Sequence, residues 1–420
     1  MSGLRFIHLI VDSPFADAAM RLFDELTPRN RYLFSSDKPR ITLKHIADPG
    51  RVELFACARR ELETTLLDGD AYDVLVLHSL TVIDPRLLPA IPERVRVWWL
   101  SWGHDIYRPS LIDTPLLLDR TAALHRELAR GGRSFFKKDD LRDLFSILFH
   151  HRHPLAVIRE RIGKRLALRN ESAGARNARE KALLENAVRR VNYCSTVLPE
   201  EFDLLAAKPF FLARRLPFSY GLDRDLYPAD AVATAPLRDG PHILIGNSAT
   251  YENNHADAFD ILRTVTLPPG SDLIAPLNYG DDAYAREITR LGGECFGTRF
   301  RPIRELLPFP RYADLLRSCS AAIFYHERQQ GFGTVALALW NGLKVFLSKN
   351  SLLYTHLKKQ GFLVLSVQDD LNAEELATPL PRDTVIAQRS LLAEHYSRAA
   401  LRKRLRESVE EIERGSNAVQ

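Results

Sequence analysis

The first hundred residues alternate short apolar runs with longer amphipathic stretches. The apolar runs predict strands at 4–11, 41–46, 74–77 and 95–100. Apolar residues at helical spacing predict helices over 16–26 and 52–67. Strands separated by helical segments of this length pair in parallel, so the pattern predicts an open α/β sheet.

The second half repeats this alternation. Strands are predicted at 242–245, 273–275, 321–326 and 343–347, and helices at 255–264, 282–291, 312–318, 334–341 and 383–414. Two open α/β domains in one chain leave a cleft at the carboxyl ends of their strands, where such folds bind ligands. The pattern therefore predicts an α/β protein with a ligand between two similar domains.

The length of the chain and its local composition predict the domain boundaries. A chain of 420 residues favours two domains. The stretch 217–240 is rich in Pro and Gly and predicts a hinge at 221–240. The resulting domains are 1–220, with a helical excursion over 108–190, and 241–385, followed by a charged helix over 386–420.

Positive charge is concentrated in the excursion. The net charge is +5, whereas residues 133–190 alone carry +8. This segment favours an anionic partner such as a membrane surface, and the alternative is a solvated helical face. Nucleic acid is disfavoured, because Phe135, Phe136, Phe145 and Phe149 are the only aromatic side chains there and all lie near its start.

Other features exclude whole classes of protein. The N-terminal apolar run is too short for a signal peptide and no run could span a bilayer, so the sequence predicts a cytoplasmic protein. The four cysteines are scattered, which predicts buried free thiols.

Two short acidic motifs and a histidine cluster could suggest a metal site. Asp68–Asp70 and Asp223–Asp225 match the DxD pattern of metal-dependent transferases, but neither follows a predicted strand. The cluster His150–His153 lacks a carboxylate or cysteine partner. We expect no metal and no cofactor.

The clearest chemical signal lies at 321–341, where a strand, a polar loop and a helix follow one another. Gly331 and Gly333 allow close backbone approach to a ligand, and Thr334 is placed to cap the helix. A helix N-terminus suits a phosphate, and Arg328 adds positive charge. Gln329 and Gln330 offer partners for hydroxyls. The alternative is an ordinary turn, because a lone GxG is weak evidence.

Two further segments have similar character. Gly246-Asn247-Ser248 follows a strand and precedes Asn253-Asn254-His255, which predicts a second lip of the same pocket or a capped turn.

The other segment, Trp98 to Tyr107, follows a strand of the first domain. It offers His104 and Asp105 as a general base beside aromatic rings that suit sugars. The alternative for Asp105 is a structural cap of a helix beginning at Ile106.

These motifs together resemble a known family. Trp102-Gly103-x-Asp105-x-Tyr107, Gly246-Asn247-Ser248 with Asn254-His255, Pro276-x-x-Tyr279 and Arg328-Gln329-Gln330-Gly331-x-Gly333-Thr334 are similar, in order and spacing, to glycosyltransferase family 56. Those bacterial enzymes transfer 4-acetamido-4,6-dideoxygalactose (Fuc4NAc) from TDP to lipid II in enterobacterial common antigen synthesis. The resemblance runs through most of 241–365. The excursion, His104, Tyr251 and Glu252 depart from the family pattern.

The resemblance implies a GT-B fold, two Rossmann-like domains facing across a cleft, and a metal-independent enzyme at the cytoplasmic face of the inner membrane. The donor is a TDP- or UDP-linked sugar and the acceptor a polyprenyl-diphosphate-linked saccharide. The implied donor-binding residues are Gly246, Asn247, Ser248, Asn254, Tyr279, Glu327, Gln329, Gln330, Gly331, Gly333 and Thr334. The implied acceptor-side residues are Trp102, Gly103 and Tyr107, and the implied catalytic residues are Asp105, His104 and Arg328.

Two alternatives remain open at the level of sequence. One is a GT-B-fold nucleotide-sugar epimerase, and the other is a non-catalytic protein that binds anionic surfaces.

Overall fold

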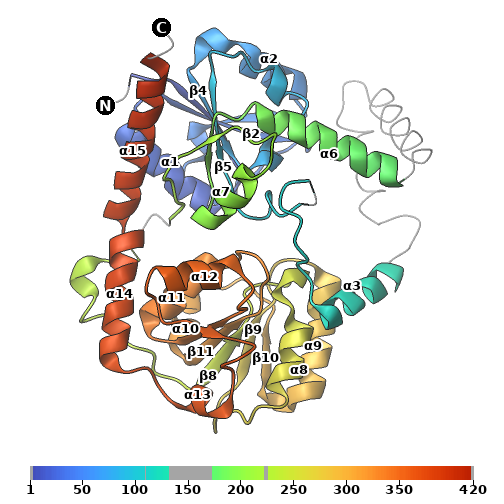
Figure 1. The fold of residues 1–420 in the computed structure, drawn as a ribbon, viewed down its shortest axis with the longest axis vertical. Helices are drawn as coiled ribbons and strands as arrows, with labels where there is room; N and C mark the ends of the chain where they lie inside the picture. Colours follow the sequence, from blue (N-terminus) through green and yellow to red (C-terminus); the bar gives the residue numbers. More distant parts are fainter. Residues whose placement is uncertain (1–2, 109, 132–172, 222–225, 418–420) are drawn as a thin grey trace. The chain divides into compact units, whose positions relative to one another are not determined.

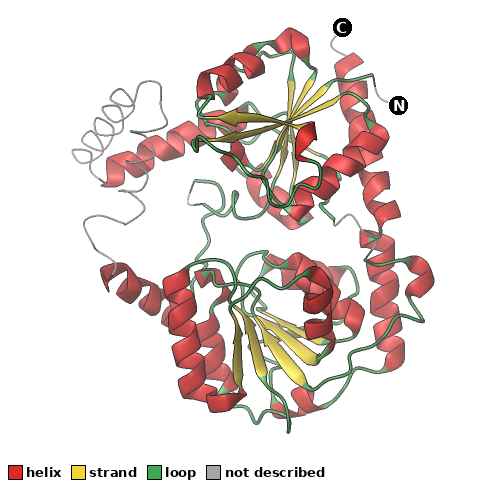
Figure 2. Ribbon diagram, turned by 180° about the vertical axis from the view of Figure 1, so that it is seen from behind, coloured by secondary structure: helices red, strands yellow, loops and turns green. Residues whose placement is uncertain are grey.

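The computed structural model describes residues 3–108, 110–131, 173–221 and 226–417. The chain divides into two compact units. Unit 1 comprises 1–113, 133–223 and 402–420, and unit 2 comprises 114–132 and 224–401. Each unit is built on a parallel sheet with helices packed against it (Figures 1 and 2).

Unit 1 contains a sheet in the order β3-β2-β1-β4-β5-β6-β7. Its elements are β1 (Phe6–Leu9), α1 (Pro14–Leu26), β2 (Asn30–Ser36), β3 (Val52–Ala56), α2 (Arg59–Leu67), β4 (Val74–His78), β5 (Arg96–Leu100), α6 (Ala173–Arg189), β6 (Tyr193–Ser195), α7 (Pro199–Ala206) and β7 (Arg214–Arg215). The central strands β1, β4 and β5 are almost wholly buried, as expected for a parallel sheet covered on both faces.

Unit 2 contains a sheet in the order β10-β9-β8-β11-β12-β13. Its elements are α3 (Asp119–Gly131), β8 (His242–Ile245), α8 (His255–Leu262), β9 (Leu273–Pro276), α9 (Asp282–Phe296), β10 (Phe300–Ile303), α10 (Phe309–Arg317), β11 (Cys319–Phe324), α11 (Phe332–Asn341), β12 (Lys344–Leu347), α12 (Leu352–Lys359), β13 (Leu365–Ser366), α13 (Ala373–Ala377) and α14 (Arg382–Tyr396). The chain winds outward from β8 to β10 on one side and from β11 to β13 on the other.

Two helices pack away from their neighbours in sequence. α3 belongs to unit 2 and lies beside α8 (Figure 1), where the Asp257 carboxylate accepts hydrogen bonds from the N–H groups of Arg120 and Thr121 at 2.9 Å. Residues 114–132 therefore pack with the second unit, although the sequence pattern groups them with the first. The last helix, α15 (Arg398–Asn417), joins unit 1 from Arg402 onward, and Arg402 forms an ion pair with Glu25 of α1 at 3.2 Å.

The main errors of the sequence prediction fall at the edge of the first sheet. The second strand is Asn30–Ser36, not 41–46, and Val52–Ala56 is a strand where a helix is predicted over 52–67. The predicted helix over 383–414 is two helices, α14 and α15, that meet at Ser397. Burial of the cysteines holds for Cys194 and Cys319, which lie in β6 and β11, whereas Cys57 and Cys295 are exposed.

Candidate functional site

The donor-side candidates gather at one edge of the unit 2 sheet. The winding direction reverses between β8 and β11, and open α/β sheets bind ligands beyond the carboxyl ends of the strands at such a switch point. Gly246–Ser248 directly follow β8, and Glu327–Gly331 lie between β11 and α11. The structure therefore brings the two predicted lips together at the position where the fold favours a ligand.

Both loops need glycine at one position. Gly246 has φ +66°, and a Cβ there would lie 2.5 Å from Nε2 of the buried His255. Gly331 has φ +65°, and a Cβ there would lie 3.0 Å from the side chain of Asn247. Left-handed backbone is costly for other residues. Gly331 therefore allows the two loops to approach closely, and Gly246 allows the loop after β8 to pack against His255.

Side-chain amides join the two loops. Gln330 Nε2 donates to Asn247 Oδ1 at 3.2 Å and to the Thr250 hydroxyl at 2.9 Å. The Oε1 atom of Gln330 is buried and has no hydrogen-bond partner in the described part of the chain. That oxygen is an acceptor available to a ligand donor group. The exposed Tyr279, which follows β9, receives a hydrogen bond from Asn247 Nδ2 at 3.1 Å.

Asn253 belongs to the predicted second lip, but the implied donor-binding residues include Asn254 and leave Asn253 out. Its Oδ1 accepts from the N–H of Asn247 at 2.9 Å and from His326 Nε2 at 2.8 Å, and its Nδ2 donates to the Ser248 hydroxyl at 3.0 Å. Burial, followed by the nearby charge of Arg328, lowers the pKa of His326 to about 3, so this imidazole is neutral. Asn253 therefore holds the loop after β8 against His326, the second residue beyond β11.

Asn254 has a different position. It lies in the left-handed region with φ 51°, and its Nδ2 donates to the carbonyl oxygens of Leu116 and Tyr325 at 3.1 and 2.9 Å. Its Oδ1 accepts from the N–H of Leu118 at 3.0 Å. With its amide engaged in these contacts, Asn254 anchors the segment before α3, and its environment favours a structural role over contact with a donor.

Helix α11 begins at Phe332, with Gly331 in the position of the N-cap. The first turn of a helix leaves N–H groups without intrahelical acceptors, and those of Phe332 and Gly333 lie in that turn. Thr334 does not cap the helix as predicted: its hydroxyl is hydrogen-bonded to Tyr312 Oη at 3.1 Å. No side chain caps the start of α11, so its first N–H groups and the positive end of the helix dipole can bind an anion.

Arg328 supplies the fixed charge near this turn. It is buried, donates to the Gln329 carbonyl oxygen at 3.0 Å and lies 3.9 Å from a Glu252 oxygen. Gln329 is also buried. Glu327 accepts from the buried hydroxyl of Ser348 at 2.6 Å, which turns its carboxylate toward β12. The loop thus combines one buried guanidinium with a helix N-terminus.

The first-domain candidates lie in unit 1 after β5. Asp105 is fully buried, and its carboxylate accepts three hydrogen bonds at 2.9 Å, from the N–H groups of Leu80 and Trp102 and from the indole of Trp99. A carboxylate engaged in this way holds a loop, so the contacts favour the structural alternative, although no helix begins at Ile106. His104 is exposed beside it, Gly103 has φ 80°, and Trp102 and Tyr107 are partly exposed.

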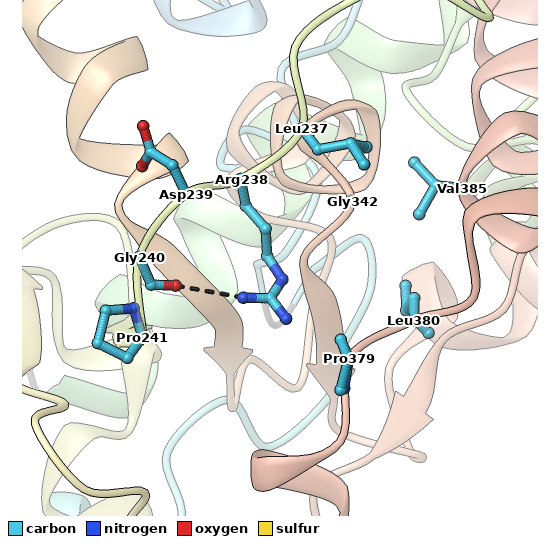
Figure 3. Close-up of a pocket in the computed structure, with 9 residues that line it drawn as sticks. All are labelled: Leu237, Arg238, Asp239, Gly240, Pro241, Gly342, Pro379, Leu380 and Val385. Atoms are coloured by element: carbon cyan, nitrogen blue, oxygen red, sulfur yellow. Dashed lines mark hydrogen bonds between the residues drawn. The ribbon is translucent and has the colours of Figure 1, made fainter.

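A separate pocket of about 510 Å³ lies in unit 2 (Figure 3). It is lined by Leu237, Arg238, Asp239, Gly240, Pro241, Gly342, Pro379, Leu380 and Val385. Its glycines precede β8 and β12, so it lies at the amino ends of these strands. Because the phosphate-binding candidates lie at the carboxyl ends, this pocket is not the predicted donor site.

The comparison with known families decides the class of protein. Residues 211–391 match the family described as 4-alpha-L-fucosyltransferase, glycosyl transferase group 56. The protein is a glycosyltransferase. The match covers nearly all of the unit 2 sheet and both loops described above, so the part of this glycosyltransferase that matches the family includes the donor-side candidates.

Solved structures confirm the fold class. A glycosyltransferase from Rickettsia africae is similar over 98% of this chain and 99% of its own, with 8% identity and a TM-score of 0.56. HepE from Anabaena in complex with UDP-glucose covers 99% of both chains at 11% identity and a TM-score of 0.53. A putative UDP-N-acetylglucosamine 2-epimerase from Listeria monocytogenes covers 99% and 98% at 12% identity and 0.50. The glycosyltransferase therefore has the predicted GT-B fold.

Two negative findings concern the described residues alone. Within 3–108, 110–131, 173–221 and 226–417, no group of His, Cys, Asp or Glu side chains is arranged to hold a metal ion. In the same ranges no helix of this glycosyltransferase has the length and apolarity needed to cross a membrane. The basic segment 133–190 falls largely on residues 132–172, outside the described residues, as do His150–His153 and Asp223–Asp225.

Proposed function

We propose that this glycosyltransferase transfers a sugar of the deoxyhexose class from a TDP- or UDP-linked donor to a polyprenyl-diphosphate-linked saccharide in bacterial surface polysaccharide synthesis. The family description, which names a fucosyltransferase, supports the sugar class. The observation that carries the donor class is that buried Arg328 and the N-terminus of α11 lie on one loop at the switch point of unit 2.

The chemistry of the proposed reaction is electrostatic. The bond between the sugar and the diphosphate breaks, and negative charge develops on the leaving diphosphate. Arg328 and the N–H groups at the start of α11 stabilise that charge where it forms. Asn247, Gln330 and Tyr279 contact the rest of the donor, with the Gln330 Oε1 atom accepting a hydrogen bond from it.

The acceptor side of the proposal rests on unit 1, where aromatic side chains and exposed His104 lie beyond β5. His104 is the candidate for taking the proton of the attacking hydroxyl, because Asp105 is buried and fully engaged. A basic segment over 133–190 complements anionic lipid headgroups, at about 1 kcal/mol per Lys or Arg close to the surface. The proposed location is the cytoplasmic face of the inner membrane, bound peripherally.

A thermal-shift series tests the donor class. TDP, UDP, GDP and CMP are added separately to the full chain, and the midpoint is expected to rise with TDP or UDP, because a ligand that binds only the folded state stabilises it by about 2.7 kcal/mol at 100 times its Kd. A response to CMP alone would contradict a diphosphate donor.

Product analysis then separates transfer from epimerisation. One similar fold is that of a putative epimerase, so this alternative has a specific basis. The expected result is nucleotide release that depends on a lipid-linked saccharide. An altered sugar-nucleotide formed without any acceptor would overturn the proposed transfer.

Co-sedimentation with anionic vesicles tests the membrane partner. The full chain is expected to sediment with the vesicles, and a variant in which residues 133–172 are deleted is expected to stay in the supernatant.

A further inference from the structure

Two buried histidines lie at the switch point of unit 1. β1 lies between β2 and β4, so the winding direction reverses at the β1–β4 pair. His8 belongs to β1, and His78 is the last residue of β4; both side chains are fully buried. The carboxyl ends of strands at such a point form the ligand crevice of open α/β folds. The chemistry proposed above assigns neither histidine a role.

The histidines form part of a continuous hydrogen-bonded chain. The Tyr220 hydroxyl lies 2.8 Å from His78 Nδ1, His78 Nε2 lies 3.2 Å from His8 Nδ1, and His8 Nε2 lies 3.4 Å from Asn30 Oδ1. Phe23 and Tyr32 enclose the His8 ring, with ring centroids 4.5 and 4.7 Å away. The chain therefore runs from the interior of unit 1 outward to Tyr220.

The direction of every hydrogen bond follows from its inner end. Asn30 Nδ2 donates to an Asp24 oxygen at 2.9 Å, so Asn30 Oδ1 is the atom that accepts from His8 Nε2. Burial lowers the pKa of His8 to about 3 and that of His78 well below its usual value, so both rings are neutral and each carries one proton.

A neutral ring with its proton on Nε2 accepts at Nδ1. His8 Nδ1 therefore accepts from His78 Nε2, and His78 Nδ1 accepts from the Tyr220 hydroxyl. The phenol proton points inward, which leaves the lone pairs of the Tyr220 oxygen as acceptors. Burial raises the pKa of Tyr220, and a hydrogen bond from the Trp102 side chain opposes that rise, so Trp102 uses one lone pair and the other is available to a ligand. A hydroxyl that donates one hydrogen bond becomes a stronger acceptor of another.

Aromatic side chains lie next to Tyr220. The rings of Tyr220 and Trp102 lie 5.0 Å apart, and the Trp102 ring meets Phe15 edge-on at 5.9 Å. Tyr220 and Trp102 are partly exposed, and Phe15 is 36% exposed. Phe15 lies in the first turn of α1 and Trp102 follows β5, so all three rings gather near the carboxyl end of the sheet. Aromatic faces beside a directed polar atom suit a sugar ring.

We propose that the Tyr220 oxygen accepts a hydrogen bond from a hydroxyl of the acceptor sugar next to the attacking one, and that the sugar ring packs against Trp102 and Phe15. His78 and His8 are positioning residues, because they hold the phenol proton inward and keep the oxygen directed outward. The inference rests on the proposed function, since it requires an acceptor saccharide at unit 1. No bond to Tyr220 forms or breaks.

The test compares the full chain with Tyr220→Phe, which removes one oxygen atom and leaves the ring. Three quantities are measured: kcat/KM for a lipid-linked saccharide, the rate of donor hydrolysis by water, and the thermal shift caused by the nucleotide. The kcat/KM for the acceptor is expected to fall about 30-fold, as for loss of a well-formed hydrogen bond in an enclosed site. Hydrolysis and the thermal shift are expected to stay unchanged.

Three further variants separate positioning from general damage. Tyr72→Phe is the matched control, because that hydroxyl also lies in unit 1 but donates to the Leu66 carbonyl oxygen in the core; it should keep full transfer. His78→Leu should reproduce the Tyr220→Phe defect. His78→Asn places an oxygen near the Nδ1 position and should recover part of the lost kcat/KM, which a merely structural role would not give.

The outcomes are distinguishable. Normal acceptor kcat/KM in Tyr220→Phe, or an equal loss of transfer, hydrolysis and thermal shift, would overturn the role of Tyr220. If the unaltered protein transfers sugar to no saccharide, the proposed function itself fails. Recovery by His78→Asn but not by His78→Leu supports the positioning chain.

Discussion

Gln330 donates a hydrogen bond from its side-chain nitrogen to the side-chain oxygen of Asn247, at 3.2 Å across 83 positions of sequence. This contact joins the loop after β8 to the loop before α11. Both side chains are largely buried, so the two lips of the proposed donor site are held together before any ligand arrives. A site with this preorganisation spends less of its binding free energy on ordering loops.

Replacement of Gln330 by Ala should therefore reduce donor binding more than it reduces the stability of the fold. Loss of the two hydrogen bonds is expected to cost about 1 kcal/mol in stability, whereas the nucleotide Kd should rise about 10-fold. Isothermal titration with the nucleotide measures the change. The control is Glu394→Ala, at an exposed position of α14, which should leave the Kd unaltered. A normal Kd in Gln330→Ala would remove this residue from the donor site.

Arg328→Ala should lower turnover by about 100-fold or more, since removing a preorganised charge from a developing anion costs on that order. Arg328→Lys should recover only part of the rate, because an ammonium group lacks the geometry of the guanidinium. Steady-state kinetics at saturating donor provide the measurement. Arg263→Ala, at an exposed arginine of the same unit, serves as the control. Near-normal turnover in Arg328→Ala would contradict the electrostatic mechanism.

Glycine-to-alanine changes should have opposite signs at two positions in unit 2. At Gly331, with φ +65° and Asn247 at 3.0 Å from the added Cβ, alanine should cost about 1–2 kcal/mol and weaken nucleotide binding. At Gly293, inside α9 with nothing within 4 Å, alanine should stabilise by about 1 kcal/mol. Chemical denaturation of both variants gives the comparison. Equal effects would show that the backbone at Gly331 is not constrained.

Asp105→Asn distinguishes a structural carboxylate from a catalytic base. In this variant an NH₂ group replaces one of the two carboxylate oxygens, so at least one of the N–H groups that donate to Asp105 would face another donor. We therefore expect the free energy of unfolding of unit 1 to fall by about 3 kcal/mol. The nucleotide-induced thermal shift should persist, because Asp105 lies outside unit 2. If the variant instead folds with unchanged stability and loses only turnover, Asp105 is the base and the structural assignment fails.

Acidification should destabilise the protein below pH 6.5. Burial lowers the pKa of His8, His255 and His326 to about 3, whereas a histidine in an unfolded chain titrates near 6.5. Between these values the unfolded state binds protons that the native state does not, so stability falls as the pH falls, by about 1.4 kcal/mol per pH unit for each histidine. Urea midpoints at pH 7, 6 and 5 measure the slope. His326→Asn should reduce it, and a flat profile would contradict neutral burial.

The sequence predicts the fold where strands are buried on both sides. β8 is predicted at its observed bounds, because a central parallel strand is a continuous apolar run. β2 and β3 are not predicted because both carry exposed polar positions, β3 being the edge strand and β2 its neighbour. The strand Val52–Ala56 also merges with α2 into one pattern of helical spacing. A strand at or near the edge of a sheet is only partly buried, so it lacks the continuous apolar run by which a central strand is predicted.

The candidate site follows the same logic. Glycines after apolar strands locate both loops, but they do not show which of Asn253 and Asn254 faces the other loop. The left-handed turn at Asn254 decides that, and it turns Asn254 toward Leu116 instead. The chain from His8 through His78 to Tyr220 joins three distant segments, so no local pattern reveals it. Burial of Asp105 likewise depends on contacts with Leu80 and Trp99 that only the folded unit supplies.

The path of the chain between the units has a consequence for modularity. Because 114–132 pack with unit 2 and 402–420 with unit 1, the polypeptide passes from one unit to the other four times. No single cut yields two complete halves: a fragment ending at 223 would lack α15, and one beginning at 224 would lack α3. Exchange of donor specificity between relatives by simple recombination at one crossover would therefore separate each sheet from a helix that packs with its unit.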